Sequence, residues 1–354
     1  MRFIGSKRLL LKNIEYVINQ NIKQGGKINT FCDIFSGTTI VSQYFKSKYK
    51  IISNDLLYFS YCLQKSYLEI NKKPKFKNLS INLEVEDYLN KSDQYKEGFI
   101  YQNYSPGGIE KRKYLSEENA KRIDNLRYKF NKWFSEDKIN KYEYYYLVSL
   151  VIEATPFISN IAGTYGAYLK NWDKRSLKKL ELNPLNIINN NKKNKSYNED
   201  CNNLIKKIEG DILYLDPPYN SRQYLPNYHL LETIAKYDDP KIKGKTGIRE
   251  YENQKSNFCN KSYAEDALES LIKNANFKYI VLSYNSEGII SEKKLEKLLK
   301  TYSKRLFKKY RFDYRRYKKD KKDKKINKDK LYELFHIIDK NYWIQLIKIN
   351  LIIY

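Results

Sequence analysis

Residues 212–224, "ILYLDPPYNSRQY", combine an apolar run, an aspartate, two consecutive prolines and a tyrosine. Proline fixes its own φ, has no N–H to donate to a sheet and forces the preceding residue into an extended conformation. Pro217 and Pro218 therefore predict the end of a strand and a stiff turn. Asp216 and Tyr219 are expected at the carboxyl end of that strand, which is where open α/β sheets bind ligands.

These residue types suit the recognition of an aromatic amine. The Asp216 carboxylate and the Pro217 carbonyl can accept the two N–H groups of an exocyclic amine, while the Tyr219 ring stacks on the attached base. Such a site needs no metal ion. The alternative is that these residues form only a rigid turn, but the features upstream in the sequence argue against it.

A second stretch, "DIFSGTT" at residues 33–39, follows a strand candidate and turns at Gly37, where the backbone can approach a ligand closely. It matches neither the GxGxxG pattern nor a phosphate-binding P-loop. Asp55 follows the next strand candidate, where nucleotide-binding α/β folds place a carboxylate that accepts hydrogen bonds from ribose hydroxyls. Asp33 and Asp55 together favour an adenosine-type cofactor without a triphosphate.

The sequence around these residues alternates between strand and helix patterns. Apolar strand candidates at residues 28–34, 50–53, 211–216 and 277–285 are separated by amphipathic helical stretches. This alternation predicts βαβ units with a parallel sheet, and hence an α/β doubly wound fold.

The alternation lapses in a long stretch rich in tyrosine and lysine, residues 85–196, which we predict to be a mainly helical insertion. Polar residues 186–200 predict a loop that leads back to the sheet. The chain is therefore divided into residues 1–84, the insertion, and residues 197–354. The last part includes a lysine run at 318–330, predicted to be a basic loop.

The composition limits the classes of protein that fit. Lys and Arg number 67 and Asp and Glu number 41 in 354 residues, and the net charge of +26 suits a polyanionic partner such as nucleic acid. A strongly A/T-biased genome would also produce abundant Lys, Asn, Ile and Tyr, so charge alone leaves nucleic-acid binding open. Four scattered cysteines with only two histidines indicate free thiols and no zinc site. Without a secretory signal or a membrane-spanning apolar run, we expect a soluble, cytoplasmic protein.

The sequence resembles the Dam-like adenine DNA methyltransferases, and more closely their restriction–modification branch. The matching stretches occur in the family's order: "RFIGSK" (2–7), "DIFSGT" (33–38), "SND" (53–55) and "DPPY" (216–219). The stretches similar to the restriction–modification branch are "SNIAGTYGAYLK" (159–170), "DPPYNSRQYLPNYHLLETIAKYD" and "LSYNSEGIIS".

The resemblance implies a Rossmann-like methyltransferase sheet that binds S-adenosyl-L-methionine, with the inserted helical region recognising the target. It implies that Asp55 contacts the cofactor ribose and Asp200 the cofactor adenine. One departure is Thr39, which stands where many methyltransferases have a second glycine. The implied cofactor-binding residues are Phe3, Gly5, Lys7, Asp33, Phe35, Ser36, Gly37, Asp55 and Asp200, and the implied catalytic residues are Asp216, Pro217, Pro218 and Tyr219.

The implied function is site-specific transfer of a methyl group to the exocyclic amino group of adenine in double-stranded DNA. It would protect host DNA in a restriction–modification system, with a cognate restriction endonuclease acting separately. The alternatives are an amino methyltransferase acting on cytosine in DNA or adenine in RNA, and a non-catalytic DNA-binding module. The intact Asp216, Pro217 and Tyr219 argue against the last of these.

Sequence readout is expected from elements that project from the sheet, because the sheet itself is committed to cofactor and target base. Arginines in the insertion and in residues 241–256 are candidates for contacting base edges. The lysine run is a candidate for contacting phosphates. The residues expected to contact DNA are Arg112, Arg175, Arg222, Arg249, Lys318 and Lys319.

Overall fold

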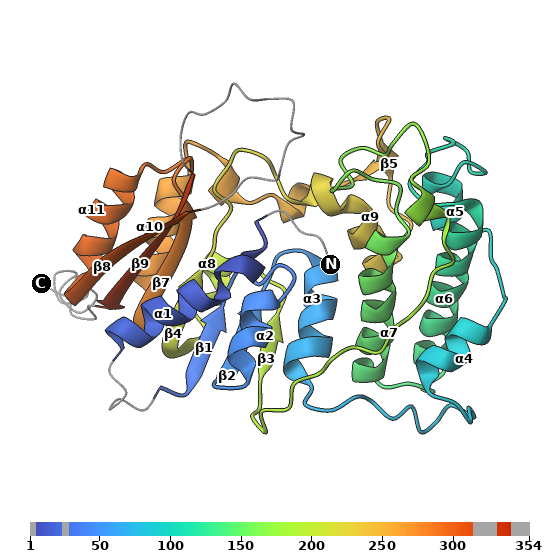
Figure 1. Cartoon of the computed structure of the whole chain (residues 1–354), viewed down its shortest axis with the longest axis horizontal. Helices are drawn as coiled ribbons and strands as arrows, with labels where there is room; N and C mark the ends of the chain where they lie inside the picture. The colour runs from blue at the N-terminus through green and yellow to red at the C-terminus, as the bar shows by residue number, and fades with distance from the viewer. Residues whose placement is uncertain (1–4, 23–27, 314–330, 341–354) are drawn as a thin grey trace, which may run out of the picture.

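The structure is a computed structural model, which describes residues 5–22, 28–313 and 331–340. It has a sheet lobe and a helical lobe, which lie on the left and right of Figure 1. Phe3, Lys318 and Lys319, three of the predicted site residues, lie outside the described residues.

The sheet lobe is built on seven strands in the order β3-β2-β1-β4-β7-β9-β8 among the described residues. Strands β3, β2, β1, β4 and β7 are parallel, whereas β9 runs antiparallel to both of its neighbours. This arrangement confirms the doubly wound α/β prediction. The strands are β1 (Thr30–Asp33), β2 (Lys50–Asn54), β3 (Lys195–Tyr197), β4 (Glu209–Leu215), β7 (Asn276–Asn285), β8 (Ser303–Asp313) and β9 (Tyr332–Lys340), and a separate hairpin pairs β5 (Ile242–Lys243) with β6 (Ile248–Arg249).

Helices cover both faces of the sheet because its central strands are apolar on both sides. Phe31 of β1 packs on one face against Phe45, with ring centroids 4.5 Å apart, whereas its neighbour Cys32 faces the opposite core. The first core includes α1 and α2, and the second includes α8, α10 and α11. The α-helices are α1 (Leu11–Asn21), α2 (Ile40–Lys46), α3 (Tyr58–Gln64), α4 (Val85–Lys91), α5 (Phe99–Tyr104), α6 (Glu117–Ser135), α7 (Lys141–Ala154), α8 (Cys201–Leu204), α9 (Leu225–Lys236), α10 (Ala264–Asn274) and α11 (Glu292–Tyr302).

The strand order reverses between β1 and β4, and this reversal locates the site. The chain leaves β1 toward β2 on one side and reaches β7 from β4 on the other. Asp33, at the end of β1, pairs in register with Tyr214, two residues before Asp216. The two aspartates therefore lie at the same edge, at the switch point where open α/β sheets bind ligands.

The helical lobe is larger than the predicted insertion. Residues 85–196 supply α4, α5, α6 and α7, but the same hydrophobic core also contains α3 and α9, which belong to the segments on either side. Polar residues 186–200 are not only a loop, because residues 195–197 form the edge strand β3. None of the helices in the described ranges is long and apolar enough to cross a membrane.

A buried carboxylate joins two helices that follow segments of the site. Glu232, on α9, has no exposed surface and accepts hydrogen bonds from the backbone N–H groups of Tyr58 and Phe59, each at 3.0 Å, at the start of α3. Gln254 donates to the same carboxylate at 2.7 Å. Since α3 follows Asp55 and α9 follows the "DPPY" turn, this contact fixes two segments of the site relative to each other.

Glu232→Ala is expected to lower the free energy of unfolding by about 3 kcal/mol, since it leaves buried N–H groups at the start of α3 without an acceptor. Denaturant unfolding would measure the change. The matched control is Glu265→Ala, which removes a surface ion pair with Lys294 and should cost under about 0.5 kcal/mol. Equal effects of the two substitutions would contradict the role given to Glu232.

Candidate active site

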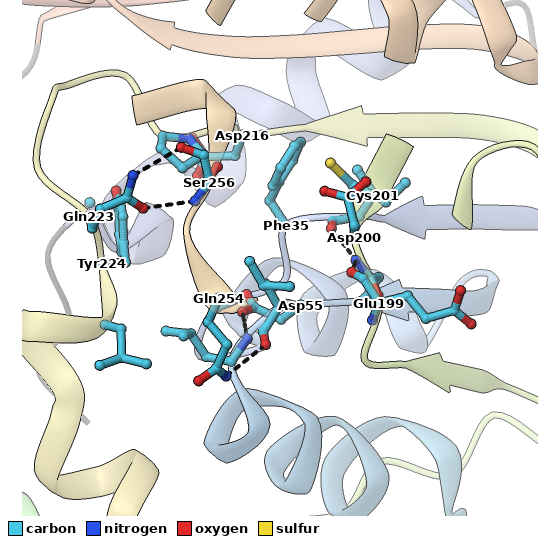
Figure 2. A pocket seen from close by; sticks show the side chains of 18 of the residues that line it. Phe35, Asp55, Glu199, Asp200, Cys201, Asp216, Gln223, Tyr224, Gln254 and Ser256 are labelled. Carbon is cyan, nitrogen blue, oxygen red and sulfur yellow. Dashed lines mark hydrogen bonds between the residues drawn. The ribbon is translucent and has the colours of Figure 1, made fainter. Parts of the chain in front are cut away.

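A cavity lies at the carboxyl edge of the sheet, over the ends of β1, β2 and β4. Its empty volume is about 850 Å³, counted with the adjoining solvent. In Figure 2, Asp216 lies on one side of the Phe35 ring and Asp200 on the other. The predicted site residues that line the cavity are Gly5, Lys7, Phe35, Gly37, Asp55, Asp200, Asp216, Pro218 and Tyr219.

One cation and two carboxylates meet in the wall of this cavity. The Lys7 ammonium lies 2.8 Å from Asp216 Oδ1 and 3.0 Å from Glu333 Oε1. The side chains of Lys7 and Glu333 are 4% and 2% exposed, whereas that of Asp216 is 20% exposed. Ser283, on β7, donates its hydroxyl to Glu333 Oε1 at 2.6 Å. The cluster is thus buried except at Asp216, which lines the cavity.

The charges in this cluster perturb one another. Burial works to lower the pKa of Lys7, but the neighbouring Asp216 and Glu333 carboxylates hold it well above its ordinary value. Burial raises the pKa of Asp216 to about 6; Lys7 opposes this shift and Glu333 adds to it. At neutral pH the cluster therefore contains a charged ammonium and an ionised Asp216, with its basicity increased.

Asp33 carries a second perturbed carboxyl group. It is 1% exposed, and its Oδ2 accepts a hydrogen bond from Ser42 at 2.8 Å. No hydrogen-bond partner for Oδ1 is found among the described residues. Burial raises the pKa of Asp33 to about 7, opposed by the Ser42 hydrogen bond and reinforced by Asp216 and Asp55. Asp33 is an incompletely satisfied acid beneath the cavity.

Asp55 holds the backbone at the cavity edge. Its Oδ2 accepts from Gly37 N at 2.8 Å and its Oδ1 from Leu57 N at 2.9 Å. Burial raises its pKa to about 6, against the effect of these two hydrogen bonds. Gly37 has a φ of +49°, the left-handed region that favours glycine. Asp55 thus fixes the turn after β1 as well as facing the cavity.

Asp200 likewise lines the cavity and holds local backbone in place. It is the N-cap of α8, with Oδ1 accepting from Asn202 N at 3.0 Å and Asn203 N at 3.1 Å. The preceding residue, Glu199, donates its N–H to Asn54 Oδ1 at 3.0 Å. Asn54 ends β2, so the cap is held against the sheet edge.

The segment after "DPPY" is clamped to a strap formed by residues 252–260. Gln223 donates to Ser256 O at 3.1 Å and accepts from Ser256 N at 2.8 Å, a reciprocal pair visible in Figure 2. Within the strap, Phe258 packs edge-on against Phe35 with ring centroids 5.1 Å apart. Gln254 and Ser256 of this strap line the cavity, as does Tyr224.

Three predicted residues lie near the cavity without lining it: Asp33, Ser36 and Pro217. Asp33 and Ser36 are buried and adjoin the lining residues Phe35 and Gly37 in the chain, while Pro217 belongs to the same turn as its lining neighbours. Thr39 adopts φ +66°, so it takes the left-handed conformation that a glycine would favour at this position.

Two of the predicted DNA-contacting arginines are buried. Arg112 is 4% exposed and donates to the carbonyls of Asn103, Gly244 and Lys245 at 3.0 to 3.1 Å. Arg249 is 5% exposed and pairs with both oxygens of Asp238 at 2.7 and 2.9 Å. Most of their donors are therefore engaged within the protein, and the expectation that these two arginines read base edges stays a prediction.

The other two arginines predicted to contact DNA, Arg222 and Arg175, are more exposed. Arg222 is exposed beside the "DPPY" turn. The side chain of Arg175 is 31% exposed and lies 3.5 Å from Asp173. Their predicted roles are left as predictions.

Several residues at the site were not predicted from the sequence. Glu333 had a signal, since "LYELFHII" places one carboxylate inside an apolar strand, where a buried charge needs a partner. Gln223, Gln254 and Ser256 had none, because ordinary polar residues in an irregular segment carry no pattern. No group of three or more metal-ligating side chains is found within the described ranges, and the four cysteines are buried and free.

A comparison with models of protein families shows which family the chain belongs to. Residues 3–298 match the model of the D12 class N6 adenine-specific DNA methyltransferases. The chain belongs to this family. The D12 match includes the "DPPY" turn and the strap but ends before Glu333.

Relatives agree with this D12 assignment. The chain is 50% identical over 323 residues to the type II methyltransferase M.FokI of Planomicrobium okeanokoites and 46% identical over 314 residues to the modification methylase StsI of Streptococcus sanguinis. These alignments cover 90% and 86% of this chain but only 50% and 46% of the relatives, so the chain spans about half their length. It is also 39% identical over 346 residues to the type II methyltransferase M.NlaIII of Neisseria lactamica, covering 97% of this chain and all of that protein.

Asp33→Asn is expected to raise the free energy of unfolding by about 2 kcal/mol at pH 8, because it removes a poorly compensated buried charge. The pKa of Asp33 is raised by folding to about 7, so ionisation destabilises the fold. The gain should therefore be full above about pH 7 and should shrink as the pH falls toward about 4, the ordinary value for aspartate.

Denaturant unfolding at several pH values would measure this effect. The matched control is Asp93→Asn, which alters an exposed carboxylate paired with Lys179. A gain in stability that is the same at pH 5 and pH 8 would contradict the assignment of a buried, ionised Asp33.

Proposed function

We propose that this protein transfers a methyl group from S-adenosyl-L-methionine to the exocyclic amino group of adenine in double-stranded DNA, at a specific sequence. The observation that carries the proposal is the partly exposed Asp216 carboxylate, held by buried Lys7 in the cavity wall. The D12 family assignment supports adenine as the target base.

The cavity suits a cationic cofactor. Asp33, Asp55 and Asp216 are all carboxyl groups with raised pKa values, and Asp33 Oδ1 lacks a hydrogen-bond partner in the described part of the chain. A positive ligand would stabilise their ionised forms. S-adenosyl-L-methionine, whose sulfonium supplies the electrophilic methyl group, has this charge. Gly5, Lys7, Phe35, Gly37, Asp55 and Asp200 would line its binding site, with Asp55 on the ribose and Asp200 near the adenine, and Asp33 and Ser36 below it.

The "DPPY" turn would activate the target base. The lone pair of an adenine amino group is delocalised into the ring, which makes it a poor nucleophile. Hydrogen bonds from its two N–H groups to Asp216 and the Pro217 carbonyl would return electron density to nitrogen, and Asp216 would stabilise the positive charge that develops there. Pro218 keeps the turn rigid, so these acceptors need little reorganisation.

The base has to leave the duplex to reach this turn, at a cost of a few kcal/mol. Stacking on Tyr219, which lines the cavity, would offset part of that cost. The helical lobe and exposed Arg222 and Arg175 are the proposed DNA-contacting parts, and the lysine run with Lys318 and Lys319 is proposed to contact phosphates. The type II and modification names of the relatives support a role in restriction–modification, with a separate endonuclease as partner.

Asp216→Ala is expected to reduce methyl transfer at least about 100-fold, the scale of losing one preorganised electrostatic contact. The assay measures labelled methyl transfer from S-adenosyl-L-methionine to long unmethylated duplex DNA, followed by nucleoside analysis. N6-methyladenine is the expected product. Methylcytosine, transfer only to RNA, or DNA binding without transfer would each replace the proposal by one of its alternatives.

Tyr219→Ala is expected to weaken binding of DNA that carries a mismatched target adenine by about 1 to 3 kcal/mol, because base stacking is lost. Tyr219→Phe keeps the ring face and should have a small effect. Equilibrium binding of the two variants measures this difference. If the phenylalanine variant were as weak as the alanine variant, stacking would not be the role of this ring.

A further inference from the structure

Glu333 has no role in the reaction described above, although it touches the same ammonium as Asp216. It lies on β9, the strand antiparallel to its neighbours, and pairs in register with Asn285 of β7. Its carboxylate is 3.0 Å from Lys7 Nζ and accepts the Ser283 hydroxyl at 2.6 Å. A 2% exposed carboxylate in an apolar strand carries a desolvation cost. This cost calls for a reason beyond packing.

Glu333 changes how strongly the Lys7 ammonium acts on Asp216. If Lys7 faced Asp216 alone, a full positive charge 2.8 Å from Oδ1 would make that carboxylate a weak acceptor. With Glu333 at nearly the same distance, the ammonium divides its hydrogen bonds between two anions. The cluster then retains a net negative charge, and part of that charge faces the cavity on Asp216.

We propose that Glu333 is a positioning residue of the active site: by sharing the Lys7 ammonium, it keeps Asp216 a strong hydrogen-bond acceptor for the amino group of the target base. Ser283 orients Glu333 for this purpose through its hydroxyl. The inference rests on the proposed function, in which Asp216 binds that amino group. It adds a residue of β9, beyond the part of the chain that matches the family model.

The direction of the pKa shifts agrees with this geometry. Glu333 raises the pKa of Asp216, which is about 6, and Lys7 lowers it. The other titratable groups that interact with Asp216 are Asp33 below the cavity, Tyr214 on β4 and Tyr224 in the cavity wall. The pKa values of both tyrosines are raised well above 10 by burial. They stay neutral near pH 6, so the charge on Glu333 is separable from theirs.

The test compares Glu333→Gln, Glu333→Asp and wild type. Glutamine keeps the shape and an acceptor oxygen for Ser283, whereas aspartate keeps the charge. The matched control is Glu296→Gln, which makes the same chemical change in a surface ion pair with Lys309. Two quantities are measured: the single-turnover rate of methyl transfer as a function of pH, and the pKa of Asp216 by carboxyl carbon NMR of the protein without cofactor or DNA.

Glu333→Gln is expected to lower the methyl-transfer rate at pH 8 about tenfold, since a less basic carboxylate is a weaker acceptor. Dissociation constants for cofactor and DNA should change less than about threefold, because the effect is made in the transition state. Removing the negative charge lowers the pKa of Asp216, so the acid limb of the rate profile should move to lower pH. Glu333→Asp should recover the position of this limb, and Glu296→Gln should match wild type.

The proposal is overturned if Glu333→Gln leaves the rate and the acid limb unchanged. It is also overturned if the variant only loses thermal stability, with no shift in the Asp216 pKa, since that would be a packing role. The NMR titration does not depend on catalysis. Absence of methyl transfer in wild type would therefore refute the proposed function, while the titration would still decide whether Glu333 tunes Asp216.

Discussion

The structure concentrates carboxylates at one edge of its sheet, and among the described residues only the Lys7 ammonium is paired with them there. Lys7 pairs with Asp216 and Glu333, while Asp33 has no cation within the described contacts and its Oδ1 has no hydrogen-bond partner among them. Burial therefore raises the pKa values of Asp33 and Asp216 toward neutrality. Such a site is costly for folding and favourable for a positive ligand. The arrangement is understandable if the missing positive charge belongs to the cofactor.

The strand order, the proline turn and several polar contacts hold the charged side chains of this edge in place. The reversal of strand order between β1 and β4 brings Asp33 and Asp216 together, and the two prolines prevent the second strand from continuing. The antiparallel strand β9, near the C-terminal end of the sequence, places Glu333 beside Lys7 at this edge. Glu232 joins α9 to the start of α3, and the Gln223–Ser256 pair joins the segment after the "DPPY" turn to the strap. The elements around the cavity are thus held by polar contacts, buried at Glu232 and partly buried at Gln223 and Ser256, as well as by apolar packing.

Local patterns in the sequence were enough to predict the sheet and the two strand ends that carry aspartates. Apolar runs followed by Asp33 and Asp216 have one structural solution in an α/β fold, so their placement at a common edge was predictable. The edge strand β3 was not, because Lys195–Tyr197 is polar and, among the described strands, pairs only with β2. The burial of Arg112 and Arg249 was not predictable for a related reason. A sequence shows that an arginine is present, but not that nearby carbonyls or Asp238 already occupy its donors.

We infer that the carboxylates at this edge balance a positive charge of the bound cofactor, in addition to that of Lys7. The most direct measurement is the number of protons released on binding S-adenosyl-L-methionine, compared with S-adenosylhomocysteine, which lacks the sulfonium charge. Calorimetry near pH 6.5 in buffers of different ionisation enthalpy gives both numbers. Because a cation lowers the raised pKa values of Asp33 and Asp216, the sulfonium compound should release more protons. Equal release by the two compounds, or none by either, would contradict the account.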